Sequence, residues 1–511
     1  MKKWHPTQSS ALLALLVVVV ALCADGARAQ GTVGDNLLSS KAKLSTLASV
    51  SVIPIANFTN LPGLTEILSS TVEGPWVCEF LDEATVVCGY ENFYAPEGDL
   101  LPGLVTYKIV GDDLVLTDII YAPAFVGIAS SAVSANPARP YAAMSYYESM
   151  IQPRNPFLPH VFSMPVYDVD VATGAFSAAP LQVINIADVD PEAWTLSIAY
   201  NGIAGMSKDG RFLVLTYGVM GVSPLPSPFP NNVNIVENRF AILELSADGA
   251  SYDVRAIVPS VSAEKLGYTS FAQKAIMEAV PGDAEMYDVG IAVNSWNLLD
   301  PLGITAQVAY YQYNATSYDF VLGGQSWSPQ YIQGVAMDVD KRRIWSICNG
   351  VANNGVSVDQ NPRQPYDNPA VHKTANLRLD EFDRDTGALA YAGGVNLGAD
   401  GIQVQPSRDS KILYTTSAPA LSNDLFLTLT NPVSPIGRRY APSITSSYSV
   451  KGNGELDLEW TTAGSPLTFA IASSPSDERL VVSGQDTFKQ IGPRVVGQRG
   501  TQLYAVAKSN K

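Results

Sequence analysis

The stretch Ser207-Lys-Asp-Gly-Arg-Phe-Leu-Val-Leu215 joins a polar turn to an apolar strand, and this pattern recurs along the chain. Asp and Gly favour tight turns, and the following run of aromatic and branched residues indicates a strand. Six other segments share the pattern, and successive copies lie 55 to 74 residues apart. The turns of the seven copies lie at Asp82, Pro137, Asp209, Asp283, Asp340, Asp409 and Asp477. Such a period predicts one supersecondary unit that is used seven times.

A second type of hairpin lies between these units. It recurs at 105–116, 166–176, 240–252, 308–318 and 379–389. Two hairpins per unit make a four-stranded antiparallel sheet, so the sequence predicts an all-β fold, a seven-bladed β-propeller. Residues 51–56 would pair with 502–507 and close the ring by joining the N- and C-terminal strands. A pair of β-sandwiches is the alternative arrangement.

The turn sequences at 207–217 and 407–416, with Phe382-Asp-Arg-Asp-Thr-Gly-Ala-Leu389, resemble the blade signatures of the YVTN and lactonase-like seven-bladed propellers. The resemblance spans most of the mature chain and implies the same fold. That superfamily includes enzymes that form or open lactones as well as binding scaffolds. No catalytic motif matches residue by residue, so no family residue is carried over.

The N-terminus has the features of a secretory signal peptide. Lys2 and Lys3 precede an apolar run at 11–24, and Ala27-Arg-Ala29 fits the small-residue pattern before a cleavage site. The run is shorter than the roughly 20 residues that cross a bilayer, so we expect cleavage and no membrane span. We predict a secreted, extracellular protein with a signal peptide at 1–29, a lead segment at 30–50 and a single propeller domain at 51–511.

Export makes the cysteines and sequons informative. Cys78 and Cys88 lie on two short predicted strands around one turn, so we expect a disulfide between them. Cys348 has no partner and lies in an apolar strand, where we expect a buried, inert thiol. Asn57-Phe-Thr and Asn314-Ala-Thr are sequons that a eukaryotic secretory route would glycosylate.

Composition and charge argue against several classes of partner. The 511 residues are 47% hydrophobic and 16% charged, with 39 Gly and 34 Pro, which is typical of a compact, turn-rich protein. Basic residues number 32 and acidic residues 48, giving a formal charge of −16. Because such a chain repels phosphate backbones and anionic lipid, we expect neither nucleic acid nor a membrane surface as a partner.

Long predicted connections gather on one face of the ring. In a four-stranded blade the hairpin tips lie on one face, and the links between hairpins and between blades lie on the other. The predicted links are 91–103, 145–163, 218–237, 294–305, 349–376 and 484–500, with 432–464 as the longest irregular stretch. Extended loops in a compact domain are usually binding or active-site elements, so we expect function on this face.

Most candidate ligand-binding residues lie in these links. Each of the two His of the mature chain follows an Arg in a Pro-rich loop, and such groups at a channel mouth could bind a carboxylate or polarise a carbonyl. Trp side chains could stack on a sugar or a partner, although packing between blades would also use them. The candidates are Arg154, His160, Trp194, Trp296, Trp327, Arg363, His372 and Asp400.

Metal and cofactor motifs are scarce. Two His and no Cys pair at ligand spacing cannot build a typical zinc or copper site, so we assign no metal or cofactor. Calcium is the one option left open, because Asp168, Asp170, Asp188, Asp190 and Glu192 offer carboxylate oxygens. The sequence contains no nucleophile elbow, phosphate loop, dinucleotide fingerprint or His-Glu-x-x-His motif, so no catalytic residue is assigned.

Two functional hypotheses follow. The first is a secreted recognition or structural module that binds a glycan, a peptide or another extracellular protein through its loop-rich face. The second is a lactonase- or cycloisomerase-like enzyme at the mouth of the central channel, with Arg and carboxylate groups such as Asp400. A closed cavity where Arg and acidic side chains converge would favour the enzyme, and a broad aromatic or polar surface would favour the module.

Overall fold

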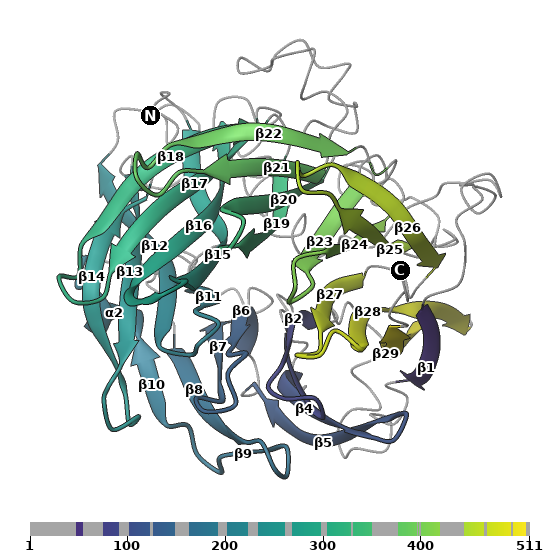
Figure 1. The fold of residues 1–511 in the computed structure, drawn as a ribbon. Coiled ribbons are helices and arrows are strands. Elements are labelled where there is room, and N and C mark those ends of the chain that lie inside the picture. Colours follow the sequence, from purple (N-terminus) through teal and green to yellow (C-terminus); the bar gives the residue numbers. More distant parts are fainter. Residues whose placement is uncertain are drawn as a thin grey trace, which may run out of the picture.

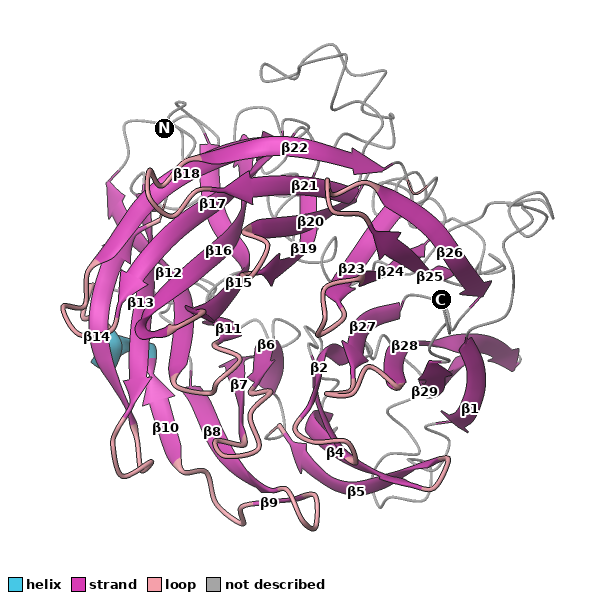
Figure 2. Cartoon of the chain, in the orientation of Figure 1, coloured by secondary structure: helices cyan, strands magenta, loops and turns pink. Residues whose placement is uncertain are grey.

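The chain folds into seven antiparallel sheets arranged radially around a central axis (Figure 1), and almost all of its regular structure is strand (Figure 2). The computed structural model describes residues 47–54, 75–90, 102–122, 126–148, 163–192, 202–222, 233–260, 268–297, 304–328, 331–349, 377–395, 397, 400–418, 444–463, 468–491 and 494–506.

The first four blades follow one another along the chain. Blade 1 consists of β2 (Pro75–Phe80), β3 (Thr85–Tyr90), β4 (Pro102–Val110) and β5 (Asp113–Tyr121). Blade 2 consists of β6 (Val126–Val133), β7 (Tyr141–Glu148), β8 (Ser163–Asp170) and β10 (Gln182–Asn185), with the short β9 (Ala175–Phe176) also paired to β8 and the one-turn helix α2 (Ile186–Val189) after β10. Blade 3 consists of β11 (Gly202–Met206), β12 (Phe212–Val222), β13 (Val233–Leu245) and β14 (Tyr252–Pro259). Blade 4 consists of β15 (Tyr268–Val280), β16 (Asp283–Asn297), β17 (Ile304–Asn314) and β18 (Phe320–Ser328).

The last three blades complete the ring. Blade 5 consists of β19 (Tyr331–Asp338), β20 (Arg343–Asn349), β21 (Leu377–Phe382) and β22 (Leu389–Val395). Blade 6 consists of β23 (Asp400–Pro406), β24 (Ile412–Ala418), β25 (Ile444–Val450) and β26 (Leu456–Ala463). Blade 7 consists of β27 (Thr468–Ser473), β28 (Arg479–Ile491), β29 (Arg494–Val506) and, from the other end of the chain, β1 (Leu47–Pro54).

The two ends of the chain meet in blade 7. Strand β1 pairs antiparallel with β29, with Leu47 opposite Val506 and Pro54 opposite Gly500. Pro54 is compatible with this position because β1 is an outermost strand with one unpaired edge. The innermost strands also contact one another in turn around the ring, including β27 with β2. The predicted seven-bladed, terminally closed propeller is therefore confirmed, and the pair of β-sandwiches is excluded.

The hydrophobic core is divided among the interfaces between blades. One cluster joins blades 7, 1 and 2, and five further clusters fill the remaining interfaces in order around the ring. Middle strands such as β3 are therefore buried on both faces and contain few polar residues. This packing is typical of radial sheets that bury both of their surfaces.

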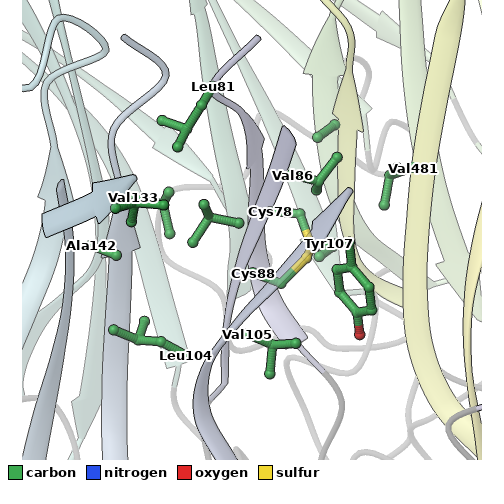
Figure 3. Packing of buried hydrophobic residues seen from close by; sticks show 14 of the residues in the cluster. Cys78, Leu81, Val86, Cys88, Leu104, Val105, Tyr107, Val133, Ala142 and Val481 are labelled. Atoms are coloured by element: carbon green, nitrogen blue, oxygen red, sulfur yellow. A yellow bond between two sulfur atoms is a disulfide. The ribbon is translucent and has the colours of Figure 1, made fainter. Parts of the chain in front are cut away.

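The predicted disulfide lies in the first of these clusters. Cys78 and Cys88 are directly opposite in the β2–β3 ladder and form a bond that is shielded by apolar side chains of blades 7, 1 and 2 (Figure 3). Cys348 is a free thiol and is buried, as expected. Burial raises the pKa of this thiol, although Arg378 acts in the opposite direction. A thiol held in its protonated form is a poor nucleophile.

All seven predicted turns join the first strand of a blade to the second. Each of the five predicted hairpins begins on the third strand of a blade, and in four of them the turn leads directly to the fourth strand. In blade 2 the short β9 comes between β8 and the fourth strand, β10. Turn chemistry thus located the hairpins correctly in most of the ring.

The prediction for residues 432–464 was wrong. Strands β25 and β26 lie within this stretch, and they complete blade 6. The pattern hid them because Thr445, Ser446 and Ser447 make β25 polar, although all three side chains are buried against β24. Serine and threonine form favourable cross-strand pairs, so a buried strand does not have to be apolar.

Several predicted links are also shorter than expected, as three examples show. Pairing of β12 with β13 continues to Val222 opposite Val233, within the predicted link 218–237. Similarly, β16 and β17 extend into 294–305, and β28 and β29 into 484–500. In each case the strand pairing continues into the residues that were predicted to form a loop.

The predicted signal peptide at 1–29 and the sequon at Asn57 lie outside the described residues. Within the described ranges, the structure has no helix of the length and apolar character that a membrane crossing requires.

Candidate functional site

Polar side chains from different blades converge on the central channel. They interrupt otherwise apolar innermost strands: Glu79 lies on β2, Lys274 on β15, Gln333 on β19, and Gln403 and Gln405 on β23. With Lys208 in the turn after β11, they line a cavity of about 90 Å³ whose walls come from blades 1 to 6. Apolar residues complete the lining, among them Val77, Ile203, Met206 and Val335.

Every innermost strand has a β-bulge where it pairs with the second strand of its blade. The register shifts lie between Pro75 and Val77, Ile128 and Ser130, Ile203 and Gly205, Ala272 and Lys274, Ile332 and Gly334, Gly401 and Gln403, and Thr468 and Ala470. A bulge bends a strand and reorients a side chain. Three of the extra residues, Ala204, Gln333 and Ile402, line the channel cavity, so the bulges help to shape it.

The charged groups of the channel influence one another. Lys208 Nζ lies 2.6 Å from Glu278 Oε1, and the Glu278 side chain is mostly buried. Burial raises the pKa of Glu278 and of Glu79, while Lys208 and Arg408 oppose the increase in both. Glu79 makes no hydrogen bond or ion pair among the described residues. The channel therefore combines two lysines, of which Lys208 pairs with Glu278, with a half-buried Glu79 side chain that has no hydrogen bond or ion pair within the described ranges.

The hairpin-turn face is the face where the first strand of each blade meets the second and the third meets the fourth. Its polar side chains form hydrogen bonds within the protein. Ser207 Oγ donates to Asp209 Oδ1 over 2.6 Å and accepts the Phe212 N–H over 2.8 Å. Ser407 and Asp409 repeat this arrangement in blade 6. These Ser and Asp side chains close the turns, which is a general role of such residues.

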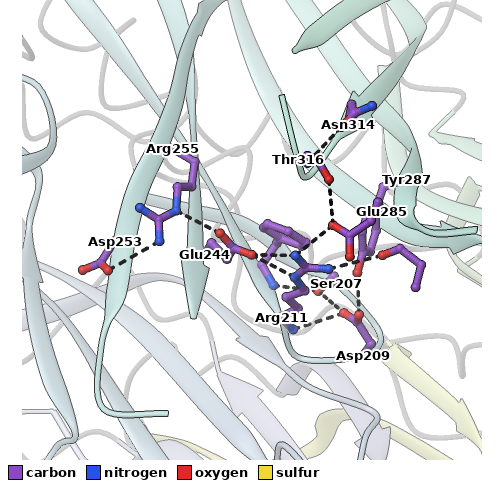
Figure 4. A network of polar contacts seen from close by, with 12 residues as sticks. Ser207, Asp209, Arg211, Glu244, Asp253, Arg255, Glu285, Tyr287, Asn314 and Thr316 are labelled. Carbon is purple, nitrogen blue, oxygen red and sulfur yellow. Dashed lines mark hydrogen bonds and ion pairs between the residues drawn. The ribbon is translucent and has the colours of Figure 1, made fainter. Parts of the chain in front are cut away.

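Side chains also connect neighbouring blades near this face. Figure 4 shows Arg211 of blade 3 between Glu244 of its own blade and Glu285 of blade 4, while the Tyr287 hydroxyl donates to Asp209 over 2.8 Å. A side-chain hydrogen bond of this kind, called a clasp below, joins every pair of neighbouring blades. In ring order the side chains that form the clasps are Lys108, Asn136, Arg211, Arg384, Arg343, Asp477 and Arg479. The polar groups of this face thus stabilise the ring.

Much longer connections begin and end at the opposite, loop-rich face. There the second strand of each blade ends and the third begins, with residues 350–376 between β20 and β21 and residues 419–443 between β24 and β25. Five of the sequence candidates, Arg154, His160, Trp194, Arg363 and His372, lie outside the described residues.

The other three candidates lie on strands of two blades. Trp296 is on β16 of blade 4, and Asp400 is the first residue of β23 at the channel, but their side chains lie outside the description. Trp327 is half-buried on β18, the outermost strand of blade 4, and its carbonyl accepts an Arg378 N–H over 2.7 Å. The two Trp residues therefore belong to blade 4 and Asp400 to blade 6.

The carboxylates considered for calcium serve turns and ion pairs. Asp170 accepts hydrogen bonds from Ala172 N–H and from Thr173 Oγ1, and these lower its pKa. Asp190 accepts the Tyr217 hydroxyl over 2.8 Å and Arg239 Nη1 over 2.9 Å. Burial alone would raise the pKa of Asp190, but these donors lower it. Within the described part of the chain, no group of three His, Cys, Asp or Glu side chains is arranged to hold a metal ion.

The channel residues were missed because each is a single polar residue in a short apolar strand. A signal was present, since Glu79 interrupts Trp76-Val-Cys-Glu-Phe80 and Gln403 interrupts Gly401-Ile-Gln-Val404. Reading the innermost strands as a set would have identified these positions, because only residues of those strands can reach the axis.

Comparisons with known proteins give matches among solved structures alone: no family model and no curated protein matches the chain. A candidate 6-phosphogluconolactonase from Bacteroides uniformis is 10% identical with a TM-score of 0.45, and the match covers 82% of this chain and 95% of that one. The periplasmic gluconolactonase of Pseudomonas aeruginosa is 13% identical with a TM-score of 0.41, covering 85% and 99%. A chain of the mitotic checkpoint complex is 9% identical with a TM-score of 0.44, covering 92% and 98%. The seven-bladed fold itself rests on the strand pairing of this chain.

Proposed function

We propose that the protein is a secreted recognition module that binds a glycan, a peptide or another extracellular protein on its loop-rich face. The observation that carries the proposal is the difference between the two faces of the ring. The hairpin-turn face consists of short turns whose Ser, Asp and Arg side chains are used within and between blades. The connections of the loop-rich face are longer, such as residues 350–376 between β20 and β21, and long connections in a compact domain often carry binding residues.

The rigidity of the ring supports this assignment. Each blade is packed on both sides, and each joint has a polar clasp, so the positions where the connections leave the strands are fixed. A rigid scaffold lowers the entropy lost when loops bind a partner. The disulfide between Cys78 and Cys88, together with the predicted export route, favours an extracellular partner.

Loop replacement tests the proposal. Residues 350–376 and, separately, residues 419–443 are replaced by a short Asn-Gly hairpin, with Asn453→Ala on the hairpin-turn face as the matched control. Each protein is applied to glycan and peptide arrays after a thermal melt has verified folding. We expect the unmodified chain and the control to bind the same probes and at least one loop variant to lose them. Absence of binding on both arrays, or retention of binding by both loop variants, would refute the proposal.

A lactonase- or cycloisomerase-like enzyme is the second candidate, and one feature of the channel favours it. Burial raises the pKa of Glu79 and Glu278, and general acid–base catalysis favours carboxyl groups whose pKa is shifted toward the working pH. In this alternative, Asp400 at the start of β23 and Arg363 act at the channel mouth.

A panel of lactones tests the enzyme directly. Hydrolysis that Arg363→Ala and Asp400→Asn each reduce, in proteins with unchanged melting, would support it. No turnover, or turnover that neither substitution affects, would remove the proposed chemistry.

A further inference from the structure

We infer that the central channel is a binding site for a small zwitterion, of the class of short-chain α-amino acids. This site is separate from the loop-rich face, so the inference goes beyond the proposed recognition function. It rests on the size of the channel cavity, on the two opposite charges of its wall and on the amide groups beside them.

The size of the cavity limits the ligand. Its volume is about 90 Å³, and one water takes roughly 30 Å³ in the liquid, so the cavity has room for about three waters. A ligand of similar volume fits, which is the size of glycine, alanine or serine. An aromatic amino acid or a disaccharide is larger than this volume.

Glu79 supplies the group that would bind an ammonium. Its side chain lies on the cavity wall and is half-buried, and it has no hydrogen bond or ion pair among the described residues. Lys208, which also lines the cavity, is already 2.6 Å from Glu278 and is therefore neutralised. Burial raises the pKa of Glu79, so an incoming ammonium would replace the hydration that the carboxylate has lost.

Lys274 and the glutamines supply the opposite pole. Lys274 lies on β15, lines the same cavity, and its charge acts on Glu79. Gln403 accepts the N–H of Val404 through Oε1, which leaves its amide N–H groups as donors. Gln333 at the β19 bulge and Gln405 on β23 add further amides to the wall. A carboxylate is bound well by an ammonium together with amide donors.

Gly334 gives the amide of Gln403 the space that it occupies. A Cβ atom at Gly334 would collide with Gln403 Oε1, the end of a flexible side chain. The glycine therefore leaves room for the amide at this position. Gly334→Ala should displace Gln403 without removing any charge from the channel.

Isothermal titration calorimetry of the full mature chain tests the inference. The probes are glycine, alanine, serine and aspartate, with methylammonium and acetate as single-charge fragments and tryptophan as an oversized control. We expect at least one short amino acid to bind with one-to-one stoichiometry. Each fragment should bind more than about tenfold more weakly, because it uses one pole of the site, and tryptophan should not bind.

Variants then assign the contacts. Glu79→Gln and Lys274→Gln should each weaken binding at least about tenfold, and Gly334→Ala should weaken it with all charges retained. The matched control is Lys411→Gln, since that lysine side chain is 78% exposed and pairs with Asp409 away from the cavity lining. If Glu79→Gln did not fold, Lys274→Gln and Gly334→Ala would decide the matter.

Absence of heat with every amino acid, equal affinity for the fragments, or unchanged affinity in the folded channel variants would overturn the inference. The array experiment is independent, because Glu79→Gln leaves the loops intact and should retain glycan or peptide binding. Failure of one site can thus be distinguished from failure of the other.

Discussion

Replacing Asp288 with alanine should destabilise the ring at the joint between blades 4 and 5. Asp288 is fully buried on β16, and its carboxylate accepts hydrogen bonds from the Tyr310 hydroxyl over 2.7 Å and from Arg384 Nε over 2.7 Å. Arg384 comes from the turn between β21 and β22 of the next blade, and its Nη2 also donates to the Val339 carbonyl over 2.6 Å. The substitution would leave a guanidinium that is only 17% exposed without its anion.

Removing one partner of a buried ion pair typically costs about 3–5 kcal/mol, because the remaining charge is desolvated and unpaired. We expect Asp288→Ala to lie within this range. Arg384→Met should cost a similar amount by leaving Asp288 uncompensated. The double variant should lose less than the two single losses combined, since neither charge is then isolated.

Urea unfolding followed by tryptophan fluorescence provides the measurement, because the free energy of unfolding falls linearly with denaturant. Lys411→Gln serves as the control, since its exposed pair with Asp409 should contribute little. A loss below about 1 kcal/mol for Asp288→Ala, in the range of exposed pairs, would refute the view that this clasp holds the joint.

Three further outcomes are expected. Replacing both Cys78 and Cys88 with alanine should lower the free energy of unfolding by about 2–4 kcal/mol, and an unchanged urea midpoint would contradict a stabilising role for the disulfide. Glu79→Gln should stabilise the protein at neutral pH. Burial raises the pKa of Glu79 in the folded state above its unfolded value of 4.5, so ionisation of Glu79 lowers the stability of the fold as the pH rises from 4.5 through the folded-state pKa. The gain should vanish below the unfolded pKa, and a gain that does not depend on pH would exclude this explanation. In a eukaryotic secretory host, mass spectrometry should find a glycan that Asn314→Gln removes, because Asn314 lies at a hairpin tip where Oδ1 accepts the Thr316 N–H over 2.8 Å; an unmodified Asn314 would reject the prediction.

The ring could be predicted from the sequence because its repeats are marked by turns. Asp209 and Asp409 lie in turns whose Ser and Asp side chains form local hydrogen bonds, so the chemistry of these hairpins is encoded within a few residues. Closure of the ring was also predictable, because the last strand at 502–507 lacked a downstream partner.

The channel and the clasps could not be predicted in the same way. Glu79 and Lys274 are almost 200 positions apart in the sequence, and they meet because both lie on innermost strands of a closed ring. Arg384 and Asp288 likewise belong to different blades, so the local sequence around either residue does not predict its ion-pair partner. Strand β25 was missed for another reason, since its buried Thr445 and Ser446 resemble a loop in composition.

Hydrogen exchange at β29 tests most directly whether the ring is closed by the two ends of the chain, on which the division into two faces and the channel both depend. The measurement compares the mature chain with one that begins after residue 54 and so lacks β1. With β1 present, amides at 500–506 should exchange slowly, because this segment pairs with β1 on one side and β28 on the other. Without β1 their exchange should accelerate, whereas equal exchange in the two proteins would contradict closure by this strand pair.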